Sequence, residues 1–113
     1  MVVEDDPDIS DLLKLHLSDL GCQTTSINNG KGALAEAWSK HFDMIILDIM
    51  LPKMNGVDVC RELRKRKIHI PVLMLTAKAE ELDKLAGLES AADEYLTRPC
   101  GIRELLARVK AML

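Results

Sequence analysis

Short, continuously apolar segments alternate with longer amphipathic segments along the whole sequence. Residues 44–47 are four consecutive apolar side chains that stop at Asp48, and residues 70–75 form a similar run that is closed by Thr76. A strand that is apolar on both faces must be covered on both faces, which happens when helices pack on each side of a parallel sheet. The alternation therefore predicts an α/β fold with a doubly wound parallel sheet.

Turn and capping residues divide the chain into five strand–helix units. Asp6-Pro7 is typical of a helix N-cap followed by the first helical residue, and Gly21 is typical of a helix end. Strands are expected at residues 1–3, 23–27, 44–47, 70–75 and 94–97. Helices are expected over residues 7–20, 30–38, 57–64, 80–89 and 102–113.

Size and composition narrow the class of protein. The 113 residues, 48% of them hydrophobic and 29% charged, indicate one globular domain over residues 1–113. A net charge of -3 does not suit a surface that grips nucleic acid, so DNA contact is expected only through a separate domain. No apolar run is long enough to span a membrane. The three widely spaced cysteines indicate reduced thiols in a cytoplasmic protein.

Acidic residues follow two of the expected strands. Glu4 and Asp5 come after the first strand, and Asp48 comes after the third. The carboxyl ends of parallel strands share one edge of the sheet, where such folds bind their ligands. We therefore expect these carboxylates to converge, with the Thr76 hydroxyl and the Arg98 cation beside them. Asp6, which also follows the first strand, is more simply explained as a helix cap.

Carboxylates packed this closely repel one another unless a cation lies between them. Mg²⁺ suits a site with few protein carboxylates and several waters. A carboxylate beside Mg²⁺ can accept a phosphoryl group, and Thr76 could then hydrogen-bond a phosphoryl oxygen. For Asp48 a purely structural role is a poor explanation, because an aspartate has no packing reason to end an apolar strand.

Five segments together resemble the receiver domains of two-component response regulators, in the order and spacing of that family. They are Val2-Val3-Glu4-Asp5-Asp6, Leu47-Asp48-Ile49-Met50-Leu51-Pro52, Asn55-Gly56, Met74-Leu75-Thr76-Ala77 and Tyr95-Leu96-Thr97-Arg98-Pro99. The resemblance covers essentially the whole chain. It implies a flavodoxin-like, five-stranded parallel sheet in the order 2-1-3-4-5 with five helices. It also implies a histidine kinase as phosphoryl donor.

The resemblance assigns roles to residues at matching positions. Asp48 is implied as the phosphoacceptor, and Glu4, Asp5 and the backbone carbonyl of Met50 as the other Mg²⁺ ligands. Thr76 and Tyr95 are implied as the pair that changes position on phosphorylation. Pro99 matches a cis-proline that fixes the direction of the Arg98 side chain.

The sub-type resembles the OmpR/PhoB-like transcriptional regulators, whose active receivers dimerise through the fourth helix, fifth strand and fifth helix. Matching residues for three ion pairs between subunits are Lys84 with Glu104, Glu89 with Lys110, and Glu94 with Arg108. If an effector domain follows Leu113, the sub-type implies that it is a winged-helix DNA-binding domain.

Three features depart from the family pattern. Arg98 stands where lysine is usual, and arginine is bulkier and forks its hydrogen bonds, so phosphorylation or its coupling to the switch is expected to differ. Ala91 replaces a usual glycine, so a shifted turn is expected there. The first strand, residues 1–3, is short for a central strand, and the natural chain is expected to begin earlier.

Other functions stay open on the sequence alone. A phosphate-independent interaction module would keep the fold and the dimer face, and Arg98 is the one residue that favours it. A Mg²⁺-dependent phosphohydrolase needs a carboxylate two residues after the nucleophile, where this chain has Met50. A flavin or dinucleotide protein needs a glycine-rich phosphate loop after the first strand, and the sequence has none there.

Overall fold

The computed structural model describes residues 1–51, 54–76, 92–97 and 101–113. Within these ranges the strands are β1 (Val2–Val3), β2 (Ser26–Ile27), β3 (Ile45–Asp48), β4 (Val72–Thr76) and β5 (Glu94–Thr97). The helices are α1 (Pro7–Asp19), α2 (Gly30–Ser39), α3 (Gly56–Lys65) and α5 (Ile102–Met112). The helix expected at residues 80–89 lies outside the described residues.

The strands form one five-stranded sheet in the order β2-β1-β3-β4-β5, and every neighbouring pair is parallel. This confirms the predicted fold class and strand order. The register places Val3 opposite Leu47 in β1 and β3, and Asp48 opposite Leu75 in β3 and β4. The three central strands, β1, β3 and β4, therefore end next to one another at the carboxyl edge of the sheet.

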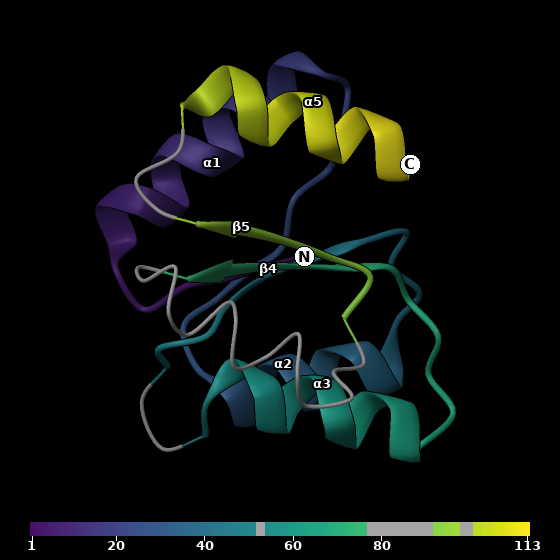
Figure 1. The fold of residues 1–113 in the computed structure, drawn as a ribbon. Coiled ribbons are helices and arrows are strands. Elements are labelled where there is room, and N and C mark those ends of the chain that lie inside the picture. The colour runs from purple at the N-terminus through teal and green to yellow at the C-terminus, as the bar shows by residue number, and fades with distance from the viewer. Residues whose placement is uncertain (52–53, 77–91, 98–100) are drawn as a thin grey trace.

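Helices cover both faces of the sheet, with α1 and α5 on one side and α2 and α3 on the other (Figure 1). Alternate residues along each strand supply the two cores, because successive side chains point to opposite faces. Val2 packs with α1 and α5 residues such as Leu13 and Val109. Val3 packs with α2 and α3 residues such as Ala33 and Leu63. The central strands β1, β3 and β4 are therefore apolar on both sides, as the sequence pattern required.

Short polar side chains begin three of the helices. The Asp6 carboxylate accepts a hydrogen bond from the backbone N–H of Asp8 at 2.9 Å, with Pro7 as the first residue of α1. Asn29 and Asn55 cap α2 and α3 in the same manner. After α1 the chain turns at Gly21, whose φ of 83° is the left-handed backbone that glycine adopts without strain. The predicted start of the first helix is confirmed, and its last residue, Asp19, lies one residue before the expected end.

The boundaries of several strands differ from expectation by one to three residues. β2 is restricted to Ser26–Ile27 because its partner β1 offers only Val2 and Val3 for pairing. Asp48 and Thr76 are the last residues of β3 and β4, where the sequence placed them just after the strands. Both residues nevertheless stand at the carboxyl edge of the sheet, as expected.

Candidate functional site

Glu4, Asp5 and Asp48 come together at the carboxyl edge of the sheet. Val3 in β1 pairs with Leu47 in β3. The residues that follow them, Glu4 and Asp48, therefore lie next to each other where these strands end. One carboxylate oxygen from each of the three acids lies within 4.8 Å of the other two. The structure therefore brings together the three acidic side chains that the sequence predicted to converge.

Burial divides the cluster into an inner pair and an outer member. Glu4 is 3% exposed and Asp48 is 7% exposed, whereas Asp5 lies on the surface. Backbone groups orient the inner pair: Glu4 Oε1 accepts the N–H of Asp6 at 3.2 Å, and Asp48 Oδ1 accepts the N–H of Met50 at 3.2 Å. Two carboxylates are thus held at the base of the site, while the third faces solvent.

The chemistry of the ligand atoms indicates which ions fit. All three groups offer carboxylate oxygens, which are the ligands of hard divalent cations such as Mg²⁺, Ca²⁺ and Mn²⁺. Like charges within 4.8 Å repel, and a cation bound among them removes that repulsion. An open hollow of ≈ 510 Å³ adjoins Glu4 and Asp5 and leaves room for water beside them. The cluster is therefore suited to a partly hydrated divalent cation.

Gly56 supports the site from below. A Cβ built on Gly56 would lie 2.5 Å from the backbone oxygen of Asp48 and 2.9 Å from the α-carbon of Ile49. The N–H of Gly56 also donates to the Ile49 carbonyl at 2.8 Å. In the sequence, Asn55-Gly56 was only one of the segments that resemble the receiver family. The structure shows that glycine is required because the start of α3 packs directly on the main chain of the central acid.

The switch residues are described in part. Thr76 ends β4, one residue beyond Leu75, which pairs with Asp48, but its side chain lies outside the described residues. Tyr95 in β5 is half-buried and packs against the α2–α3 core. Its hydroxyl oxygen is buried and has no hydrogen-bond partner within the described ranges. Arg98 and Pro99 lie outside those ranges, as does Ala91.

The dimer residues that can be located lie on β5 and α5. Glu104, Arg108 and Lys110 are exposed on α5, whereas Lys84 and Glu89 lie outside the described residues. Glu94 Oε1 and Arg108 Nη1 are 3.7 Å apart within the same chain, with side chains 41% and 49% exposed. Glu94 and Arg108, one of the three pairs predicted between subunits, are therefore already neighbours in one subunit.

The family model for the response regulator receiver domain matches residues 1–110. The chain belongs to the response-regulator receiver family. Five parallel strands in the order 2-1-3-4-5 and the acidic cluster at their carboxyl edge agree with that assignment. This confirms the family predicted from the sequence.

Curated relatives confirm the predicted OmpR/PhoB sub-type. The receiver is 47% identical over 113 residues to the alkaline phosphatase synthesis transcriptional regulatory protein PhoP of Bacillus subtilis. It is 44% identical over 113 residues to the sensory transduction protein RegX3 of Mycolicibacterium smegmatis. Both alignments cover 100% of this chain but only 47% and 49% of the relatives, so the chain spans about half of their length.

Among solved structures, the receiver is similar to the response regulator TrrA of Thermotoga maritima in complex with Mg²⁺-BeF. The two share 37% sequence identity with a TM-score of 0.89, covering 99% of this chain and 96% of TrrA.

Cys22 and Cys60 are free thiols, and Cys100 lies outside the described residues. Among the helices that the structure describes, each is too short or too polar to cross a membrane.

Proposed function

We propose that Asp48 accepts a phosphoryl group from a histidine kinase and that this modification controls dimerisation of the receiver in the cytoplasm. The observation that carries the proposal is the buried carboxylate of Asp48, held with Glu4 and Asp5 at the carboxyl edge of the sheet. In the family to which the chain belongs, the matching aspartate is the phosphoacceptor.

Glu4, Asp5, Asp48 and the backbone carbonyl of Met50 would hold Mg²⁺. The bound ion supplies positive charge that offsets the negative charge on the transferring phosphoryl oxygens. Glu4 is buried and oriented by the N–H of Asp6, so it fixes the inner wall of the site. Asp5 completes the site from the solvent side. The Mg²⁺-BeF complex of TrrA supports this assignment by similarity.

Transfer requires one bond to form and one to break. A carboxylate oxygen of Asp48 forms the new P–O bond while the bond between phosphorus and the imidazole nitrogen of the donor breaks. The electron pair of the broken bond stays with that imidazole. The N–H of Met50, at 3.2 Å from Asp48 Oδ1, holds the carboxylate in one orientation for this attack. Thr76 and Arg98 are proposed to bind the new phosphoryl oxygens.

The proposed output is a second copy of this chain, bound through residues 80–89, β5 and α5. Movement of Thr76 toward the phosphoryl group and of Tyr95 behind it would rearrange this face. The proposed pairs between subunits are Lys84–Glu104, Glu89–Lys110 and Glu94–Arg108. Because Glu94 and Arg108 are already close within one chain, their pairing across a dimer exchanges one contact for another and adds little affinity. Affinity must then come from the rest of the face.

A transcriptional role is proposed through a separate DNA-binding domain. The curated relatives are about twice as long as this chain, and PhoP is a transcriptional regulatory protein. The receiver itself carries a net charge of -3, which does not favour contact with DNA phosphates.

The phosphoacceptor is tested by intact-mass analysis after incubation with acetyl phosphate and Mg²⁺. We expect one phosphoryl adduct on the wild-type chain and none on Asp48→Asn. Asp43→Asn is the matched control, because Asp43 is an exposed aspartate and is not part of the acidic cluster. Absence of an adduct on the wild-type chain would refute the proposal and favour the phosphate-independent module. Sustained hydrolysis of a small phosphoester would instead favour a phosphohydrolase.

A further inference from the structure

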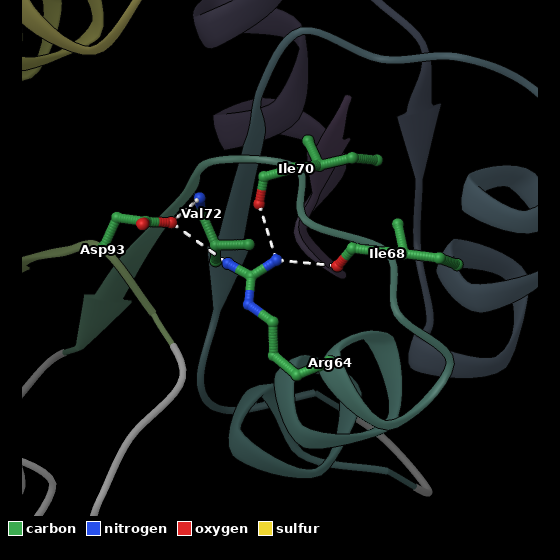
Figure 2. Close-up of polar contacts among 5 residues, drawn as sticks. All are labelled: Arg64, Ile68, Ile70, Val72 and Asp93. Carbon is green, nitrogen blue, oxygen red and sulfur yellow. Dashed lines mark hydrogen bonds and ion pairs between the residues drawn. The ribbon is translucent and has the colours of Figure 1, made fainter.

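Arg64, near the end of α3, joins this helix to the segment that follows it and to Asp93, which is 29 residues away (Figure 2). Its Nη1 donates to the carbonyls of Ile68 and Ile70 at 2.8 and 2.9 Å. Its Nη2 donates to Asp93 Oδ2 at 3.1 Å. The Arg64 side chain is only 20% exposed. The planar guanidinium uses both of its ends, which a lysine ammonium cannot reproduce.

Asp93 joins this network to the sheet. The same Oδ2 atom accepts the N–H of Val72 at 2.8 Å, while the N–H of Asp93 donates to the Val72 carbonyl at 3.0 Å. Both backbone polar groups of Val72 are therefore bound by one residue. Asp93 precedes β5 and Val72 begins β4, so these contacts fasten the first end of β5 to β4 and to α3. We call Arg64 and Asp93, with these contacts, the clasp.

A second arginine on the same helix shows what an ordinary surface pair looks like. Arg66 Nε contacts Glu62 Oε1 at 3.3 Å, one helical turn away, and its side chain is 41% exposed. That ion pair links α3 only to itself, and Arg66 also lies 5.9 Å from the centroid of the exposed Trp38 ring on α2. The clasp differs because it joins a helix to the starts of two strands, and because its arginine side chain is only 20% exposed, although the Asp93 side chain is 52% exposed.

The clasp lies at the opposite end of β5 from the acidic cluster. β5 begins next to Asp93, carries Tyr95 opposite Met74, and ends with Thr97 opposite Thr76. Thr76 stands at the carboxyl edge of the sheet, where the phosphoryl group is proposed to bind. The clasp therefore holds β5 at its first end. The other end of β5 lies beside Thr76, where the proposed switch acts. A strand without the first anchor could slide as a unit and leave Tyr95 in its old environment.

We propose that Arg64 and Asp93 are positioning residues that anchor β5, so that phosphorylation at Asp48 is transmitted to Tyr95 and the dimer face. This inference rests on the proposed function. It assigns no contact with the phosphoryl group to either residue. Loss of the clasp should therefore leave ligand binding at Asp48 intact and weaken only its transmission.

The test uses Mg²⁺ with beryllofluoride as the phosphoryl analogue and follows Tyr95 directly. The chain has a single tyrosine, so incorporation of fluorotyrosine gives one ¹⁹F resonance, which reports the surroundings of Tyr95. The variants are Arg64→Lys, which keeps the charge but loses the fork, and Asp93→Asn, which keeps the size but loses the charge. Arg66→Lys is the matched control on the same helix.

We expect the wild-type chain and Arg66→Lys to show the same change of resonance and the same dimer dissociation constant. In Arg64→Lys and Asp93→Asn, the beryllofluoride affinity is retained, the resonance stays partly at its resting position, and dimerisation weakens at least about 5-fold, the low end of allosteric coupling. Retained beryllofluoride affinity shows that these variants are folded. Wild-type responses in both variants would overturn the inference. Failure of the wild-type resonance to respond to bound analogue would instead refute the proposed function.

Discussion

Gly56 lies against the main chain of Asp48 so closely that a Cβ on it would stand 2.5 Å from the Asp48 carbonyl oxygen. The atom it would meet is backbone, which cannot rotate away as a side chain can. The first turn of α3 and the central acid of the site are therefore fixed relative to each other by the absence of one methyl group.

We expect Gly56→Ala to lower both stability and phosphorylation. Overpacking at such a contact typically costs about 1–3 kcal/mol, and the displaced main chain carries the Asp48 carboxylate with it. Urea unfolding and the rate of adduct formation with acetyl phosphate measure the two effects. Gly101→Ala is the matched control, because a Cβ on Gly101 meets nothing within 4 Å. A comparable loss of phosphorylation in Gly101→Ala would show that the contact between Gly56 and Asp48 is not the cause.

We expect the effect of Asp5→Asn on stability to depend on whether Mg²⁺ is present. Without the metal, Asp5→Asn removes one of three charges within 4.8 Å of one another, so stability should stay level or rise by up to about 1 kcal/mol. With Mg²⁺ the wild-type chain gains stability by mass action, about 2.7 kcal/mol at a hundred times the dissociation constant. Asp5→Asn should lose most of that gain.

Thermal melts with and without Mg²⁺ measure this difference. Asp19→Asn is the control, because Asp19 is the last residue of α1 and lies at the far end of that helix from Asp5. An Asp5→Asn variant that gains as much from Mg²⁺ as the wild-type chain would place the ion elsewhere.

The sequence predicted the sheet and the acidic cluster well because both depend on local patterns. Continuous apolar runs specify buried parallel strands, and the residue after each run falls at the carboxyl edge whatever the loops do. Glu4, Asp5 and Asp48 follow from that rule. The Asp6 cap is equally local, since it needs only the N–H of Asp8 two residues away.

Contacts between distant segments could not be predicted in this way. Arg64 and Asp93 are 29 residues apart. In the sequence, Arg64 cannot be distinguished from any other charged residue on an amphipathic helix. The close approach of Gly56 to Asp48 depends on the three-dimensional path of the intervening loop, so the sequence did not reveal it. The pairing of Glu94 with Arg108 inside one chain was likewise hidden, because opposite charges on neighbouring elements do not reveal whether they meet within or between subunits.

We expect the buried Cys60 thiol to make the free energy of unfolding depend on pH in the alkaline range. Burial raises the pKa of the Cys60 thiol above its usual value of 9.0, with Arg64 opposing the shift and Asp93 adding to it. The folded state therefore keeps the proton that the unfolded state releases. This contribution is fully present below about pH 9 and is lost as the pH rises toward the higher folded pKa.

Urea unfolding between pH 8 and about pH 10 measures this dependence. We expect the free energy of unfolding to fall with pH more steeply in the wild-type chain than in Cys60→Ala. Val59→Ala is the control, because Val59 is also fully buried on α3 but has no titratable group. It should lower stability at every pH and keep the wild-type slope. Equal slopes in wild type and Cys60→Ala would contradict the burial argument.

Lys67, just after α3, adopts a φ of 61°, the left-handed conformation that residues with a Cβ adopt at a cost of roughly 1–2 kcal/mol. Its N–H donates to the Arg64 carbonyl, and the next N–H, of Ile68, donates to Leu63, which is the usual closure of a helix end. Lys67→Gly should therefore raise the free energy of unfolding by about 0.5–1 kcal/mol, after the greater freedom of glycine in the unfolded chain is subtracted. Lys65→Gly, at the last residue of α3, should lower it by up to about 1 kcal/mol. Urea unfolding compares the two, and a loss of stability in Lys67→Gly would mean that the lysine side chain itself stabilises the helix end.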